Sequence, residues 1–138
     1  MTDIDVVFFG SQWVEQMLDR SLRADPAIEI AASTDNNAEL FDFLQARQPQ
    51  LLVLEYTPEH PNLLLLVRQI RTHFPRVKLA ILAHNTDVSQ VRELISGGIS
   101  GYLTLESALD ELGASIRLMS GGKLILSAEI THALLAAD

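Results

Sequence analysis

The sequence predicts an α/β fold, a doubly wound five-stranded parallel sheet with helices on both faces. Short apolar runs alternate with segments whose apolar residues recur at helical spacing. The connections between them are short, and five such strand–helix pairs follow one another within 138 residues. A strand order of 2-1-3-4-5 is common for five pairs of this kind, and it is the order expected here.

The first pair is the clearest. The run "IDVVFFG" at 4–10 predicts a buried strand that ends at a glycine, and "SQWVEQMLDRSLRA" at 11–24 predicts a helix. Ser11 is its expected N-cap, and Trp13 begins the apolar stripe that packs on the sheet. Pro26 ends this helix. The later strands are expected at 27–33, 76–83 and 100–105, and the later helices at 37–48, 62–74, 86–98 and 107–122.

The stretch "QLLVLEYTPEHP" at 50–61 contains the third strand. Its apolar core, residues 51–54, is typical of a strand buried on both faces, and Glu55 follows where the strand opens to solvent. Ligands of open α/β sheets bind outside the carboxyl ends of the strands. Glu55 is therefore the first candidate for a functional residue.

The tail "KLILSAEITHALLAAD" at 123–138 lies outside the five-pair pattern. It predicts a short extended piece and a last helix, with Ser127 as N-cap. The chain is accordingly divided into a domain at 1–122 and a linker helix at 123–138 that leads towards another domain or a partner chain.

Composition excludes several classes of function. A formal net charge of −8 argues against a nucleic-acid surface on this segment, because phosphate contacts need clustered lysine and arginine. The chain has no cysteine, which excludes thiol catalysis and disulfides. The longest apolar run is too short to cross a membrane, and the N-terminus lacks the basic segment of a signal peptide. A cytoplasmic location is expected.

Three motifs at matching spacing resemble the receiver domain of bacterial response regulators of the LuxR/NarL type. They are "QPQLLVLEYTP", "LISGGISGYLTLES" and "LMSGGKLILSAEI". The first is similar to the family strand that ends in the phosphate-accepting aspartate, and Glu55 stands at that place. The third is similar to the segment before the family's DNA-binding domain. The resemblance implies a CheY/flavodoxin-like fold over about the whole chain.

The residues that would accompany a phosphorylated aspartate in the family differ here. Phe9 and Gly10 stand at the acidic pair that holds Mg²⁺, Ala83 at the small hydroxyl residue, and Leu105 at the lysine. Phosphoryl transfer to a carboxylate needs a metal that neutralises the phosphoryl charge, and Mg²⁺ needs several oxygen ligands. Only Tyr102, the aromatic of the fifth strand, fits the family pattern. Glu55 is therefore expected to be an inactive phosphoacceptor equivalent, with no metal site and no cofactor.

Three roles for Glu55 stay open: a solvated acid without a role, a partial mimic of phospho-aspartate, and a metal ligand. Phe9 and Leu105 are expected to fill the mouth of the pocket with apolar side chains. Tyr102 is either a half-buried strand aromatic or the switch residue that the resemblance implies.

Other candidate sites are weaker. The four histidines are scattered, although His60 and His84 can both lie near the carboxyl edge of the sheet. Trp13 is expected to pack between helix and sheet, with an exposed contact patch as the alternative. The sequence offers no nucleophile–base pair or cofactor loop, so an enzyme is not expected.

The expected function is a degenerate, or pseudo-receiver, domain for signalling and dimerisation in a LuxR/NarL-like transcription regulator. Its output would depend on protein contacts or a small ligand, with DNA bound only by a C-terminal domain absent from this chain. A homodimer is expected because the family forms dimers. The alternative is a stand-alone adaptor that docks onto a kinase or another protein.

Overall fold

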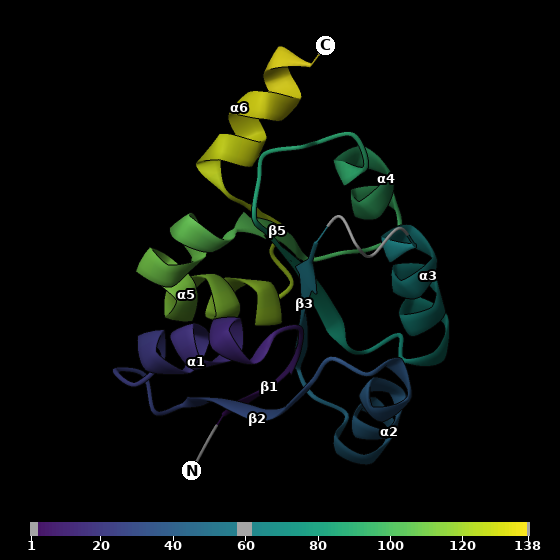
Figure 1. The fold of residues 1–138 in the computed structure, drawn as a ribbon, viewed down its shortest axis with the longest axis vertical. Helices are drawn as coiled ribbons and strands as arrows, with labels where there is room; N and C mark the ends of the chain where they lie inside the picture. The colour runs from purple at the N-terminus through teal and green to yellow at the C-terminus, as the bar shows by residue number, and fades with distance from the viewer. Residues whose placement is uncertain (1–2, 58–61, 138) are drawn as a thin grey trace.

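The computed structural model describes residues 3–57 and 62–137 as a single parallel sheet between two layers of helices (Figure 1). The strands are β1 (Ile4–Phe9), β2 (Ile28–Thr34), β3 (Leu51–Tyr56), β4 (Lys78–Ala83), β5 (Gly101–Thr104) and β6 (Ile125–Leu126). The helices are α1 (Gln12–Ser21), α2 (Asn37–Arg47), α3 (Leu63–His73), α4 (Val91–Ser96), α5 (Leu105–Ser120) and α6 (Ala128–Ala136).

The sheet order is β2-β1-β3-β4-β5-β6, with every neighbouring pair parallel. The expected order of the first five strands is confirmed. The expected number of strands is wrong, because residues of the tail add a sixth strand to β5. The backbone N–H of Ile125 donates to Ser100 O, and that of Ser127 donates to Tyr102 O.

The two faces of the sheet bury two separate apolar clusters because side chains alternate along each strand. In β1, Val7 and Phe9 pack beneath α2, α3 and α4, whereas Val6 and Phe8 pack beneath α1 and α5. Full burial of each large apolar side chain contributes roughly 1.5–3 kcal/mol to stability.

The tail packs closely on the domain. Ile130 of α6 is fully buried in the same cluster as Phe9. Ser127 is the N-cap of α6 by backbone position, as expected, but its Oγ accepts the backbone N–H of Thr104 at 2.9 Å. Residues 123–138 thus begin as part of the sheet, and a further domain beyond them stays a prediction.

Helix α4 is shorter than the expected range of 86–98. The preceding residues form a loop in which Asn85 Oδ1 accepts the N–H of Asp87 at 2.9 Å, and Asp87 Oδ1 accepts the N–H of Ser89 at 3.0 Å. Such side chains compete with the first helical hydrogen bonds. The helix ends at glycines as expected: Gly97 is its C-cap, and Gly98, the next residue, has a φ of +99° that favours a residue without Cβ.

Candidate functional site at the carboxyl edge of the sheet

Glu55 is buried and lies between β1 and β4. It occupies the next-to-last position of β3, where it pairs in register with Leu82, and only 6% of its surface is exposed. Its side chain points to the α1/α5 face because Leu51 and Val53, two and four positions earlier, pack on that face. The interpretation of Glu55 as a solvated acid is therefore wrong.

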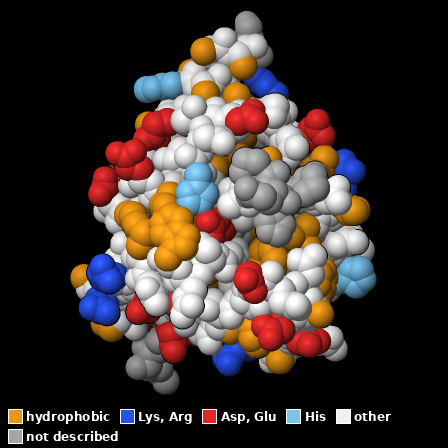
Figure 2. All heavy atoms as spheres, in the orientation of Figure 1, with side chains coloured by type: hydrophobic (Ala, Val, Ile, Leu, Met, Phe, Trp, Pro, Cys, Tyr) orange, Lys and Arg blue, Asp and Glu red, His pale blue; other side chains and the backbone are white. Residues whose placement is uncertain are grey.

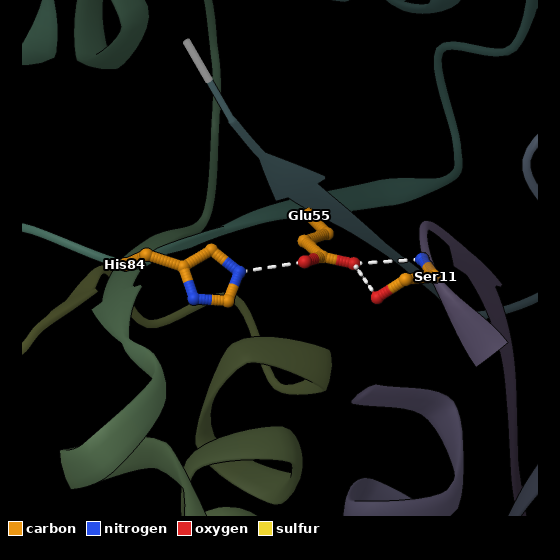
Figure 3. Close-up of polar contacts among 3 residues, drawn as sticks. All are labelled: Ser11, Glu55 and His84. Atoms are coloured by element: carbon orange, nitrogen blue, oxygen red, sulfur yellow. Dashed lines mark hydrogen bonds and ion pairs between the residues drawn. The ribbon is translucent and has the colours of Figure 1, made fainter. Parts of the chain in front are cut away.

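Both carboxylate oxygens of Glu55 accept hydrogen bonds from this chain (Figure 3). Oε1 accepts the backbone N–H of Ser11 at 2.7 Å and the Ser11 hydroxyl at 2.8 Å. Oε2 lies 2.6 Å from Nε2 of His84. An ionised carboxylate can only accept, so Nε2 of His84 is the donor in this pair.

Ser11 and His84 lie next to Glu55 because of the order of the strands in the sheet. The strands β1 and β4 flank β3, so the residues that follow their carboxyl ends meet at one edge of the sheet. Ser11 is the backbone N-cap of α1, as expected, but its hydroxyl makes no capping bond and donates to Glu55. His84 comes directly after β4, which confirms its expected place at this edge. His60 lies outside the described residues.

The environment of Glu55 stabilises its charged form. Burial raises the pKa of Glu55, but the Ser11 backbone N–H, the His84 ring and the Ser11 hydroxyl outweigh burial and hold it below its ordinary value of 4.5. The N-terminus of α1, where backbone N–H groups point outward, adds a favourable field for an anion. Glu55 is therefore a fixed negative charge at neutral pH.

Gly10 provides the space that Glu55 occupies. A Cβ atom at this position would lie 2.5 Å from Glu55 Oε1, 2.6 Å from Glu55 Cβ and 2.7 Å from Phe8 Cζ. Ordinary contacts are longer than 3.4 Å. Any side chain at position 10 requires Glu55 or Phe8 to move.

The expected apolar plug over Glu55 is not formed. Phe9 is 2% exposed and belongs to the cluster beneath α2, α3 and α4, whereas Leu105 is half-buried against the opposite cluster. The two residues line separate hollows, of about 320 Å³ beside Phe9 and about 450 Å³ beside Leu105. Polar partners, Ser11 and His84, surround the carboxylate instead.

Ala83 and Tyr102 lie away from the carboxylate. Ala83 is fully buried and pairs with Tyr56. Tyr102 is 2% exposed and pairs with Ile81 and Leu126. Burial, together with the nearby Tyr56 and Asp87, raises the pKa of Tyr102 to about 12.

The residues at the edge do not suit a magnesium ion. Phe9 and Gly10 supply no side-chain oxygen, and both oxygens of Glu55 are already bonded. Within residues 3–57 and 62–137, no three histidine, aspartate or glutamate side chains lie close enough together to hold a metal ion. The Mg²⁺ that the family resemblance implies therefore does not fit this site.

The order of the three polar residues also differs from that of a serine hydrolase. There the histidine lies between serine and acid and takes the serine proton. Here Glu55 lies between Ser11 and His84, and the Ser11 hydroxyl donates to a carboxylate that already accepts two other donors. The hydrogen bonds that lower the pKa of Glu55 make this carboxylate a weak base towards the Ser11 hydroxyl, and the arrangement holds and orients a charge.

Trp13 lies on the outer side of His84. Its ring is 5.9 Å from the His84 ring, centroid to centroid, with planes inclined by 41°. Trp13 is 55% exposed, so the expected packing between helix and sheet is wrong, and a role of the exposed ring as a contact patch stays a prediction. The helix buries Val14 and Leu18 instead.

Comparisons with known proteins agree with this fold. No family model matches the chain. The transcriptional regulatory protein DegU of Brevibacillus brevis is 22% identical over 130 residues, which cover 94% of this chain and 55% of that protein. The DNA-binding transcriptional activator DevR/DosR of Mycobacterium tuberculosis is 25% identical over 115 residues, covering 83% and 53%. The chain spans about half the length of these relatives.

Solved structures resemble the whole chain. A two-component response regulator of the LuxR family from Aurantimonas sp. has a TM-score of 0.86 at 19% identity and covers 99% of this chain and 98% of its own. The isolated receiver domain of RcsB from Salmonella enterica, in the presence of a phosphomimetic, has a TM-score of 0.82 at 15% identity, covering 96% and 99%. A structure of two RcsB dimers bound to DNA has a TM-score of 0.84 at 16% identity, covering 97% and 69%. The chain has the response-regulator receiver fold.

The part of the chain that the structure describes contains no helix that is both long and apolar enough to span a membrane.

Proposed function

We propose that this chain is the receiver-like signalling and dimerisation domain of a LuxR/NarL-like cytoplasmic regulator, and that it works without phosphorylation of Glu55. The observation that carries the proposal is the occupation of both Glu55 oxygens by donors of the chain itself. A domain of this fold needs no added phosphate to place a bonded anion at the end of β3.

Three features oppose phosphoryl transfer to Glu55. A nucleophilic carboxylate oxygen must be free to approach phosphorus in line with the leaving group, whereas both Glu55 oxygens are directed at protein donors. No second carboxylate stands at Phe9 or Gly10 to bind the metal that would neutralise the phosphoryl charge. Leu105 supplies no cation to the site.

The Glu55 carboxylate instead acts as a permanent partial mimic of a modified aspartate. A phosphoryl group presents close to two negative charges, and Glu55 presents one. The hydroxyl of Ser11 and the ring of His84, which follow β1 and β4 on either side of β3, bind this charge. We propose that these contacts favour one arrangement of the site in every condition in which Glu55 is ionised.

The output of the domain passes through protein contacts. Binding to DNA is proposed only for a C-terminal domain that is not part of this chain. A homodimer is supported by the dimers in the RcsB–DNA structure, whose receiver part shares this fold. The exposed Trp13 supports a second, different protein partner. This feature also suits the alternative of a stand-alone adaptor, and a helix-turn-helix encoded after Asp138 would decide against that alternative.

Intact-mass spectrometry after incubation with acetyl phosphate and Mg²⁺ tests the proposal. We expect no gain of a phosphoryl group in the wild type or in Glu55→Asp, because the single substitution supplies no further metal ligand. A receiver domain with a complete acidic pair serves as the positive control. A gain of one phosphoryl group that Glu55→Gln abolishes would contradict the proposed function.

A further inference from the structure

An apolar hollow lies beside the Glu55 site, between α1, the segment after β4, and the start of α5. Its volume is about 450 Å³, and its apolar lining comes from Met17, Leu105 and Leu109. His84 lines the hollow as well, and the exposed Trp13 ring lies against the His84 ring. We call Trp13, Met17, His84, Leu105 and Leu109 the Trp13 surface. Exposed tryptophans beside apolar pockets are typical anchors of protein interfaces.

Acidic side chains border the Trp13 surface. Glu106 and Glu129 line the hollow, and Asp110, one helical turn after Glu106, is exposed on α5. The sequence from 93 to 116 contains no lysine or arginine. Figure 2 shows hydrophobic side chains gathered beside a histidine over α1 and α5, and a row of acidic side chains along the neighbouring edge of the molecule. The surface therefore combines apolar anchors with a negative rim.

Contacts inside the chain hold this rim in place. The Ser107 hydroxyl donates to the Glu129 carboxylate, at 2.6 Å to Oε1 and 2.9 Å to Oε2, which joins α6 to the first turn of α5. Thr104 Oγ1 accepts the N–H of Ser107 and caps α5. The acidic side chains stand on two helices that are hydrogen-bonded to each other, so they lose little conformational entropy when a partner binds.

We propose that the Trp13 surface binds an amphipathic segment of a protein partner that carries lysine or arginine beside leucine-like apolar residues. The apolar side chains enter the hollow and cover Trp13, while the cations face Glu106 and Asp110. Complementary charge accelerates the encounter and fixes the register of such a segment. Because the Trp13 ring lies against the His84 ring at a tilt, a partner that covers Trp13 also approaches the residue that bonds Glu55.

The charge of the rim argues for this occupant over others. A second copy of the chain would bring an equally acidic rim to the same surface, and like charges disfavour that pairing. Nucleic acid is repelled for the same reason. This inference rests on the proposed signalling function in that it names the partner surface of the domain.

Trp13 makes the test direct, because it is the single tryptophan of the sequence and its fluorescence reports on the surface itself. The probe is a short synthetic helix of leucine and lysine at amphipathic spacing. The matched peptide has glutamate in place of every lysine. We expect the lysine peptide to shift the Trp13 emission with saturation, and added salt to weaken binding.

Matched variants separate this surface from the general negative charge of the protein. Glu106→Gln with Asp110→Asn removes two charges from the rim, and Asp35→Asn with Asp42→Asn removes two charges near and on α2. The first pair is expected to weaken binding about tenfold, since two exposed ion pairs are lost, and the second to leave it within about twofold. Calorimetry with Trp13→Ala, an exposed position, is expected to show a similar or larger loss.

Three results would overturn the proposal: no saturable change in Trp13 emission, equal affinity for the glutamate peptide, or equal loss in both double variants. The outcome is distinguishable from failure of the proposed function. Phosphorylation of Glu55 would contradict that function and leave the peptide titration unchanged. An unphosphorylated protein that binds no lysine peptide would contradict the Trp13 surface alone.

Discussion

Nε2 of His84 lies 2.6 Å from Oε2 of Glu55, although the two residues are 29 positions apart in the chain. The contact exists because β3 and β4 are parallel neighbours and both residues stand at their carboxyl ends. Ser11 bonds the other carboxylate oxygen of Glu55. At the position of the expected phosphoacceptor, the chain therefore holds a carboxylate whose two oxygens are both hydrogen-bonded.

Loss of the Glu55 charge is expected to destabilise the fold. Glu55→Gln replaces a carboxylate that accepts three hydrogen bonds with a neutral amide. The free energy of unfolding near pH 7 should therefore fall by about 1.5–3 kcal/mol. Glu29→Gln, at an exposed acid of β2, is the matched control and should change it by less than about 0.5 kcal/mol. Urea denaturation of both variants measures the difference, and equal effects would contradict the role of the three contacts.

The stability difference between the wild type and Glu55→Gln is also expected to depend on pH, in a direction that the pKa of Glu55 determines. The pKa of Glu55 in the folded state lies below the ordinary value of 4.5, so the unfolded chain binds the proton more readily. The stability from the charged form is present above that value and is lost as the pH falls through the folded-state pKa. The stability difference between wild type and Glu55→Gln should therefore shrink below pH 4.5. A difference that grows on acidification would show the opposite sign.

Gly10 is expected to tolerate no side chain. Gly10→Ala places a Cβ within 2.7 Å of three atoms of Glu55 and Phe8, and such overpacking costs roughly 1–3 kcal/mol. Gly121→Ala is the matched control, because its Cβ would meet only ordinary contacts of 3.5 and 3.6 Å. Thermal unfolding compares the two. A Gly10→Ala protein as stable as the control would mean that Glu55 moves aside freely.

Tyr102 is expected to stay inside the core. In a Tyr56→Phe background it is the remaining tyrosine, and its absorbance titration should still show a pKa raised above the ordinary value of 10, because burial, the largest cause of the shift, is retained. Ionisation near the ordinary value of 10 would instead indicate a ring that spends much of its time in solvent. That result would support a switch role for Tyr102.

A homodimer is predicted through the far end of α5. Leu118 and Leu124 are 48% and 47% exposed there, and the turn between them is closed by the Lys123 N–H on Leu118 O. Met119, the residue after Leu118, is fully buried and takes no part. Sedimentation at micromolar protein should show a dimer that Leu118→Glu disrupts and Leu135→Glu, at an exposed leucine of α6, leaves intact. A monomer in the wild type would contradict this prediction.

The sequence predicts the sheet better than the site. Continuous apolar runs, typical of strands buried on both faces, are sufficient for β1, β3 and β4, and their order follows from the common solution for such folds. Strand β6 has only two residues, too few to show a periodic pattern of apolar side chains. The sequence therefore indicates a linker at the tail. The periodicity of α1 includes Trp13 in the apolar stripe, but the edge of a stripe is set by the packing of neighbours.

The partners of Glu55 are harder to predict for a related reason. A serine before a helix is first interpreted as a cap, and only the direction of its hydroxyl distinguishes a cap from a ligand of Glu55. A single histidine after a strand carries no spacing signal. The only signal in the sequence is that Ser11 and His84 both follow the ends of strands that flank β3.

Heteronuclear NMR of the Ser11 amide and the His84 ring, with and without Mg²⁺ and beryllofluoride, tests the central claim most directly. Because Glu55 is already bonded on both oxygens, we expect the resonances of Ser11, Glu55, His84 and Tyr102 to stay unchanged on addition of both reagents. Saturable shifts centred on these residues, lost in Glu55→Gln, would show that the site opens to accept a phosphoryl mimic and would contradict the claim.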